Sequence, residues 1–154
     1  MKYIHYGCSS YDPARFETIK NRPDIPKPSG GLWASRIDAR YGWYQWAKDT
    51  RTFKNSLNSS FTFSLSENAR ILVIDSVSQL ADLPRNDNNV FSELAAMGYR
   101  PSFVLWVFLD FEKLSETYDA IEVFVSSGEK IRQTLDSWDC DSLLVMNPNV
   151  VEPD

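Results

Sequence analysis

The chain holds one histidine, His5, and the residues around it could bind a ligand. It lies in the stretch HYGCSS, where Tyr6 is an aromatic neighbour, Gly7 allows a ligand to approach the backbone and Ser9 supplies a hydroxyl. A histidine at the end of a strand, directly before a glycine, is well placed to hydrogen-bond a ligand. The alternative, with about equal weight, is that His5 is an ordinary polar residue of a strand.

Two aromatic stretches could form the walls of a pocket for a flat ligand. In GGLWAS, two glycines precede Trp33 and Ser35, so the backbone could come close to a ligand there. In YGWYQW, Trp43 and Tyr44 lie on different faces of an expected helix, and either ring could stack on a heterocycle. Packing of both tryptophans into the core is the competing interpretation.

A pair of acidic residues precedes the last clear strand. Asp139 and Asp141 are two residues apart in DCDSLLVMN, which would place both side chains on one face of an extended segment. Two carboxylates in one cleft raise each other's pKa and can do acid–base or electrostatic work. They could equally be solvated loop residues, and Glu122, at the start of another strand, is a rival carboxylate.

The elements that must position these residues alternate irregularly between strands and short helices. The residue patterns predict strands over 2–7, 31–35, 59–66, 69–76, 120–126 and 141–147. They predict short helices over 9–21, 38–50, 76–84, 110–118 and, as helix or loop, 128–138, with a brief helix within 85–101. Asp12 before Pro13 is an expected helix cap, and Asp38 is another. The stretch 102–111 fits either a strand or an apolar helix. This mixture predicts an α+β fold with split, mostly antiparallel β-sheets.

The bulk composition limits the possible functions. A length of 154 residues suits a single domain over 1–154, and the net charge of −5 argues against non-specific binding of phosphate backbones but not against a local basic cleft. Cys8 and Cys140 form no metal-binding pattern, so no metal site is expected. No apolar run reaches membrane length. These features predict a soluble cytoplasmic protein with reduced cysteines and no membrane partner.

The order of these motifs resembles the ADP-ribosyltransferase fold of the diphtheria-toxin and poly(ADP-ribose)-polymerase type, with its His–Tyr–Glu arrangement. The stretch HYGCS is similar to the histidine motif, with one residue inserted between His5 and Gly7. GLWAS is similar to the second motif, with Trp33 in place of tyrosine, and Tyr44 falls near the spacing of a further aromatic. Asp141 stands where the family has a glutamate that opens a strand.

The resemblance implies an enzyme that uses NAD as a substrate and transfers ADP-ribose to a macromolecule, as a toxin, defence or counter-defence effector. Asp141, assisted by Asp139, would be catalytic, and His5 would bind the adenosine ribose. The other residues that would bind NAD are Tyr6, Gly7, Ser9, Trp33, Ser35, Trp43 and Tyr44. The acceptor would be a protein, with a nucleic-acid acceptor left open. Two alternatives remain: a non-catalytic binding or inhibitor protein on an α+β scaffold, and an RNA 2′-phosphotransferase-like enzyme using Arg36, Arg40 and Arg51.

Overall fold

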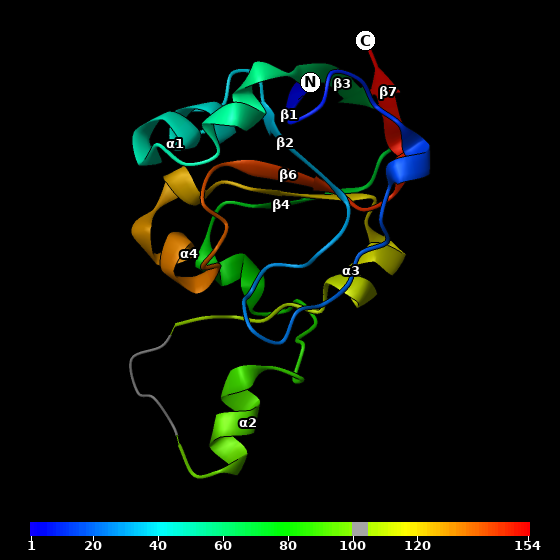
Figure 1. Ribbon diagram of the computed structural model, residues 1–154. Coiled ribbons are helices and arrows are strands. Elements are labelled where there is room, and N and C mark those ends of the chain that lie inside the picture. Colours follow the sequence, from blue (N-terminus) through cyan, green and yellow to red (C-terminus); the bar gives the residue numbers. More distant parts are fainter. Residues whose placement is uncertain (100–104) are drawn as a thin grey trace.

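A computed structural model describes residues 1–99 and 105–154 and has an α+β fold (Figure 1). The strands are β1 (Lys2–Tyr6), β2 (Leu32–Arg36), β3 (Ser60–Leu65), β4 (Ile71–Ile74), β5 (Ala120–Val123), β6 (Ser142–Val145) and β7 (Val151–Pro153). The α-helices are α1 (Trp43–Thr50), α2 (Val90–Ala96), α3 (Phe111–Thr117) and α4 (Glu129–Thr134). Short 3-10 helices are η1 (Pro13–Arg15), η2 (Lys54–Asn58), η3 (Val77–Leu80), η4 (Val125–Ser127) and η5 (Pro148–Val150).

The seven strands form one sheet in the order β4-β5-β6-β2-β1-β3-β7. Only β4 and β5 run parallel among the paired strands of the described residues, which agrees with the expectation of mostly antiparallel pairing. Contrary to the expected split, all seven strands are connected by hydrogen bonds. The connection is shortest between β1 and β2, which are in register only at Tyr3↔Arg36 and Ile4↔Ser35. After Ile4 on β1 and before Ser35 on β2, the two strands have no further paired residues, which leaves room for a space between them.

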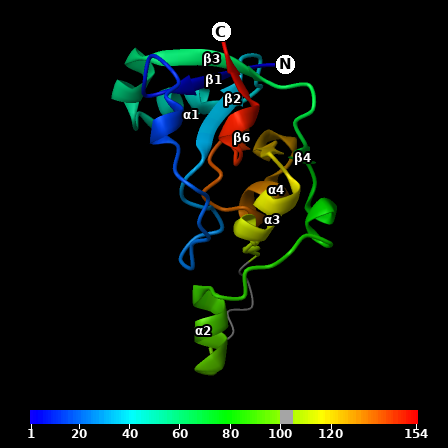
Figure 2. The ribbon, with the colours of Figure 1, turned by 90° about the vertical axis from the view of Figure 1, so that its right-hand side faces the viewer.

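The helices lie around the sheet, except for one that extends away from it. Figure 1 shows α1 beside β1 and β2 and α4 below α1, and α3 packs on the same face of the sheet as α4, because their buried residues share one hydrophobic cluster. Two views at right angles show α2 projecting beyond the rest of the molecule (Figure 2). No helix among the described residues is both long and apolar enough to cross a bilayer.

Two hydrophobic clusters occupy the two faces of the sheet. One contains Trp138, Leu144 and the buried residues of α3 and α4, and the other contains Tyr3, Phe63 and Leu143. Leu143 and Leu144 belong to different clusters because successive side chains of β6 point to opposite faces. The apolar run of β6 is therefore explained by burial on both faces, as expected for a central strand.

Local sequence signals were accurate where a cap or an apolar alternation fixed the backbone. The Asp12 side chain accepts a hydrogen bond from the Ala14 amide, as expected, although the helix that follows is only η1. Asp38 does not cap α1, which begins after Gly42 instead. Of the ambiguous stretch 102–111, the first three residues lie outside the described residues, and 105–108 is neither helix nor strand.

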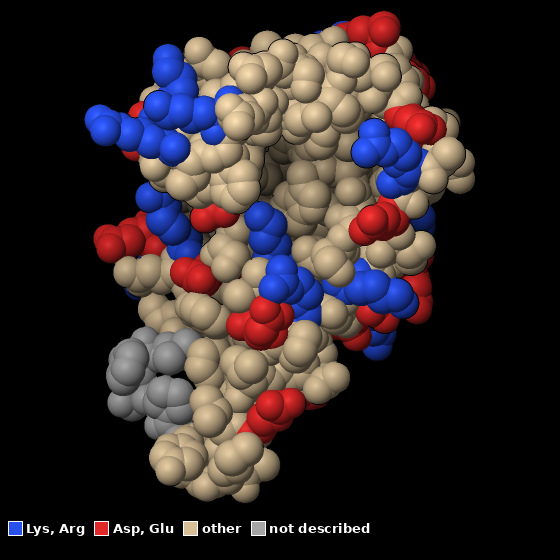
Figure 3. Space-filling view, viewed as in Figure 1, with Lys and Arg blue, Asp and Glu red and all other residues tan. Residues whose placement is uncertain are grey.

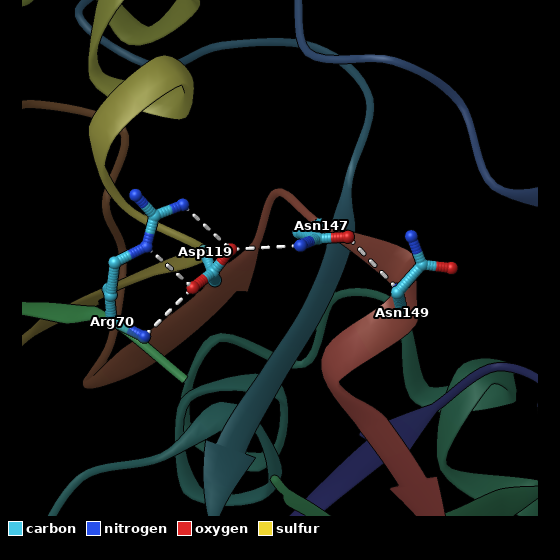
Figure 4. A network of polar contacts seen from close by, with 4 residues as sticks. All are labelled: Arg70, Asp119, Asn147 and Asn149. Atoms are coloured by element: carbon cyan, nitrogen blue, oxygen red, sulfur yellow. Dashed lines mark hydrogen bonds and ion pairs between the residues drawn. The ribbon is translucent and has the colours of Figure 1, made fainter. Parts of the chain in front are cut away.

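A network of hydrogen bonds between polar side chains lies at the C-terminal end of β6 (Figure 4). Asp119 accepts hydrogen bonds from the backbone amide and the guanidinium of Arg70, at 2.9, 3.1 and 3.2 Å. The Asn147 side chain donates to the same carboxylate at 2.8 Å and accepts from the Asn149 amide. These bonds hold the pKa of Asp119 far below its usual range, with the Arg70 side chain as the largest cause.

Candidate functional site

A cavity of about 260 Å³ lies where β1, β2 and the segment before β6 meet. Its lining residues are Ile4, His5, Tyr6, Lys27, Trp33, Ala34, Ser35, Trp43, Asp139, Cys140 and Ser142. The space-filling view shows the surface hollowed in its upper half (Figure 3). The cavity therefore collects residues from the histidine stretch, both aromatic stretches and the acidic stretch, four segments in all.

His5 is fixed by a hydrogen bond across the gap between β1 and β2. Its Nδ1 lies 2.6 Å from the carbonyl oxygen of Trp33, and because a carbonyl only accepts, Nδ1 carries the proton. Nε2 is then free to accept a hydrogen bond, and it has no partner among the described residues. The ring also packs on Phe61 at 5.2 Å between centroids. His5 and Trp33 thus share one cavity, as expected.

Trp33 forms one wall of the cavity and is locked in place. Its indole nitrogen donates to the Gly30 carbonyl at 3.1 Å, and its ring packs edge-on against Trp138 at 4.8 Å. Lys27 lies over the Trp33 ring, with Nζ 4.5 Å from the centroid, a cation–π geometry. Burial lowers the pKa of Lys27, while Asp139 opposes that shift. Lys27 was not among the expected site residues, because it lies outside the predicted elements, between the helix over 9–21 and the strand over 31–35; its place between two prolines was a visible signal.

Asp139 is the acidic residue of the cavity. Its carboxylate lies 4.0 Å from Lys27 Nζ, a loose ion pair, and the side chain is 38% exposed. Burial is the largest cause that raises the pKa of Asp139, and Lys27 lowers it. A carboxylate with a single distant partner retains its capacity to interact with a positively charged ligand.

Asp141 differs from the expectation that it faces the cavity with Asp139. It is only 3% exposed, and its two carboxylate oxygens accept hydrogen bonds from the amide and the hydroxyl of Ser126, at 2.8 and 2.6 Å. The chain bends at Cys140 and Asp141, so the two-residue alternation of an extended strand does not apply there. Asp141 also receives the Ser35 hydroxyl on its carbonyl oxygen and donates its amide to Tyr41. It joins η4, β2 and the residues before α1.

The remaining expected residues divide between the cavity and its surroundings. Tyr6, Ser35 and Trp43 line it, and the Ser35 hydroxyl also accepts a hydrogen bond from the Trp43 amide. Tyr44 is 48% exposed and lines a neighbouring cavity of about 200 Å³ instead.

The residues after His5 lie at or beyond the edge of the cavity. Gly7 has a φ of 119°, and a Cβ added there would lie 3.8 Å from His5 Nε2. Ser9 is exposed and is not among the lining residues of the cavity.

The paired glycines approach the chain itself and not a ligand. Gly30 and Gly31 have φ values of 80° and 70°, and a Cβ on Gly30 would collide with the carbonyl of Thr18. A Cβ on Gly31 would lie 2.5 Å from a methyl group of Leu144. Their role is therefore to bring the loop that carries Lys27 against β6.

The residues of the alternative interpretations do not line this cavity. Glu122 is 3% exposed and forms a two-bond ion pair with Arg36, with both N–O distances 2.6 Å. Arg36 and Arg40 line the neighbouring cavity that contains Tyr44, whereas Arg51 lines none of the three cavities described in this section. The three arginines do not converge on one phosphate-sized site.

Comparison with protein-family models, with curated proteins and with solved structures finds no match to the chain. Over residues 1–99 and 105–154, no group of three His, Cys, Asp or Glu residues is placed to hold a metal ion. Cys8 and Cys140 are both free, and burial raises the pKa of the Cys140 thiol to about 11.

A second cavity of about 190 Å³ adjoins the first at His5, which lines both. Its polar lining comes from the loop after β1 and from η1, with Ser10, Asp12 and Arg15. Gly31, Leu32 and Phe61 complete its apolar side. His5 is the residue that the two cavity linings have in common.

Proposed function

We propose that the chain is an NAD-dependent mono-ADP-ribosyltransferase, with NAD bound in the His5–Trp33 cavity and the cavity that adjoins it. One observation carries the proposal: a histidine, an aromatic wall and a carboxylate, from β1, β2 and the segment before β6, line a single cavity. These are the three residue types, in the same order along the chain, on which the resemblance to the ADP-ribosyltransferase fold was based.

The residues present fit a dinucleotide of this kind. The aromatic rings of Tyr6, Trp33 and Trp43 suit a flat nicotinamide, and the cavity volume suits one ring with its ribose. The second cavity has Arg15 for a phosphate charge. His5, between the two cavities, has Nε2 available to accept a ribose hydroxyl proton in a hydrogen bond.

In the reaction, the bond between C1′ of the ribose and the nicotinamide nitrogen breaks, and its electron pair leaves with neutral nicotinamide. An acceptor atom forms a bond to C1′ and loses its proton to water. Positive charge develops on the ribose during this exchange, as in glycoside hydrolysis. We assign Asp139 as the carboxylate that stabilises this charge, and Asp141 as a positioning residue that orders η4 and the start of α1. Without a ligand, the ammonium of Lys27 partly neutralises the charge of the Asp139 carboxylate. A bound ligand would change this balance by separating the two groups or by bringing its own charge close to them.

The test is a pair of measurements on the full chain: a shift in melting temperature with NAD, and release of nicotinamide with and without cell extract. Wild type should show both effects. Asp139→Asn should keep NAD binding and slow nicotinamide release about a hundredfold, the scale expected for one preorganised electrostatic group. The matched control is Asp82→Asn, an exposed aspartate outside the cavity, which should behave as wild type. Absence of any NAD-dependent shift would refute the proposal.

Binding without turnover is the second candidate, and one observation favours it. Asp141, which stands where the family has its strand-opening glutamate, has both oxygens bonded to Ser126 and does not face the cavity. A chain that binds NAD but releases no nicotinamide, in wild type and Asp139→Asn alike, would fit a binding or inhibitor protein and not a transferase.

A further inference from the structure

The basic charge of this acidic protein is concentrated around α1. Residues 40–54 contain four basic side chains and one acidic one, a net charge of +3. The rest of the chain contains 12 basic and 20 acidic side chains, a net charge of −8, which together give the total of −5. The space-filling view shows several basic side chains gathered over α1 (Figure 3). A polyanion would therefore meet a favourable local charge around α1, although the molecule as a whole is acidic.

Two exposed aromatic rings, those of Tyr44 and Phe53, belong to the same segment as these cations. We call this surface the α1 platform: Arg40, Tyr44, Lys48, Arg51, Phe53 and Lys54, all exposed. Tyr44 and Lys48 are one helical turn apart, and Lys48 Nζ lies 5.0 Å from the centre of the Tyr44 ring. Phe53 is 64% exposed, an unusual state for a phenylalanine.

The platform is joined to the cavity by stacked rings. Phe53 packs on Trp46 at 6.1 Å between centroids, nearly parallel, and Trp46 packs on Trp43 at 4.9 Å. Trp43 lines the cavity that also contains His5 and Trp33. A molecule held on the platform would thus lie beside the proposed NAD site.

The cations of the platform have no carboxylate partner among the described residues, and Lys48 contacts only Tyr44. The ion pairs found over residues 1–99 and 105–154 involve Lys2, Arg22, Lys27, Arg36 and Arg70. None of the four cations of the platform takes part in them. A phosphate can therefore bind these cations without first breaking an ion pair inside the protein.

We propose that the α1 platform binds a single-stranded nucleic acid, which is the acceptor of the transfer. Basic side chains interleaved with exposed rings match a ligand that carries phosphates and unpaired bases, since bases stack on aromatic side chains. A duplex hides its base faces, and an acidic peptide needs no exposed phenylalanine. Binding to the platform is independent of the proposed function, whereas the acceptor role rests on it.

The experiment measures anisotropy of fluorescein-labelled dT20 and U20 oligonucleotides with the full chain and no NAD, between 50 and 200 mM salt. With four phosphate contacts, we expect a slope of log K against log salt of about −3. Lys48→Gln/Lys54→Gln should weaken binding about fivefold and reduce the slope by about 1.4. The matched control, Lys20→Gln/Lys113→Gln, removes two exposed lysines elsewhere and should change neither value.

Phe53→Ala tests the aromatic part and should weaken binding about tenfold, the scale of one lost base stack. Phe53 is exposed, so folding should survive, and the melting temperature checks it. Failure of both oligonucleotides to bind, equal weakening by the control pair, or no effect of Phe53→Ala would each overturn the platform. Equal competition by a base-free polyphosphate would also overturn it.

A third measurement separates this inference from the proposed function. Incubation with NAD and the oligonucleotide that binds should add an ADP-ribosyl group, detected by mass spectrometry, and Phe53→Ala should reduce that yield. Oligonucleotide binding without any NAD-dependent melting shift would retain the platform and refute transfer. An NAD-dependent shift with no oligonucleotide binding would retain the NAD site and refute the platform.

Discussion

Asp119 and Asp139 lie at opposite ends of β6 and have opposite surroundings. Asp119 accepts four hydrogen bonds from Arg70 and Asn147, whereas Asp139 has only Lys27, at 4.0 Å. The pKa of Asp119 is lowered by its partners, and that of Asp139 is raised by burial. An aspartate with all its acceptor capacity satisfied stabilises the fold. One that is partly buried and poorly paired costs stability, which is common at sites that bind ligands.

The largest expected difference between the two ends is in the free energy of unfolding. Asp119→Ala should lower it by about 3 kcal/mol, because the change leaves the Arg70 amide and the Asn147 side chain without an acceptor. Asp139→Ala should change it by less than about 1 kcal/mol. Urea unfolding of both variants measures the difference. Equal losses for the two would show that both carboxylates are structural.

The second prediction concerns the loop that brings Lys27 to the end of β6 beside the cavity, where Asp139 lies. Gly30→Ala should lower the free energy of unfolding by about 2 kcal/mol or more, because it adds a collision with Thr18 to the strain of a positive φ. Gly98→Ala is the control, with a φ of 89° and open space around the glycine, and it isolates the strain alone. If the two variants unfold alike in urea, the loop does not depend on its close contact with residues 17–18.

The third prediction is that acid affects the two ends in opposite directions. The pKa of folded Asp119 is below its unfolded value near 4, so its stabilisation is present above pH 4 and is lost as the pH falls. The pKa of folded Asp139 is above its unfolded value, so stability falls as the pH rises from about 4 through the folded pKa.

Unfolding free energies of wild type, Asp119→Asn and Asp139→Asn between pH 2 and 7 measure these two effects. The wild-type advantage over Asp119→Asn should shrink as the pH falls. Wild type should lose stability relative to Asp139→Asn as the pH rises just above 4. Parallel curves for the two variants would contradict the comparison.

The smallest expected effect on stability comes from Lys27→Met. It should change the free energy of unfolding by less than about 1 kcal/mol, because burial of the ammonium opposes its weak ion pair. The pKa of Asp139 should rise further, because Lys27 lowers it in the wild type. Carbon NMR of the carboxyl groups follows this titration. A fall in that pKa would mean that Lys27 does not act on Asp139.

The sequence predicted what depends on local backbone preference. Alternation in 59–66 gave β3, the apolar run of 141–147 gave β6, and Asp12 before Pro13 gave the cap of η1. Strand β7 was not predicted, because its three residues, Val151–Pro153, are too few to show an alternation of polar and apolar side chains. The grouping of the histidine, tryptophan and carboxylate stretches around one cavity was anticipated from their motifs.

What the sequence could not predict depends on contacts between distant segments. Asp139 and Asp141 were assigned to one face because extended backbone was assumed, but the bend at Cys140 and Asp141 separates them. Lys27 reaches the cavity only because Gly30 and Gly31 hold its loop against residues 17–18 and β6. Ser126, which binds the Asp141 carboxylate, lies 15 residues away. No local pattern identifies such a partner.

The position of β6 in the sheet has a consequence for how the protein is made. This strand, at residues 142–145, pairs with β5 on one side and β2 on the other, so it joins the two groups of strands. During synthesis, β1, β2 and β3 can pair early, and so can β4 and β5, but the two groups stay unconnected until the ribosome has released β6. Until then both exposed strand edges are open to pairing with other chains, and the cavity lacks Asp139, Cys140 and Ser142. Premature termination shortly before residue 139 would yield an aggregation-prone fragment and not a weakened form of the folded protein.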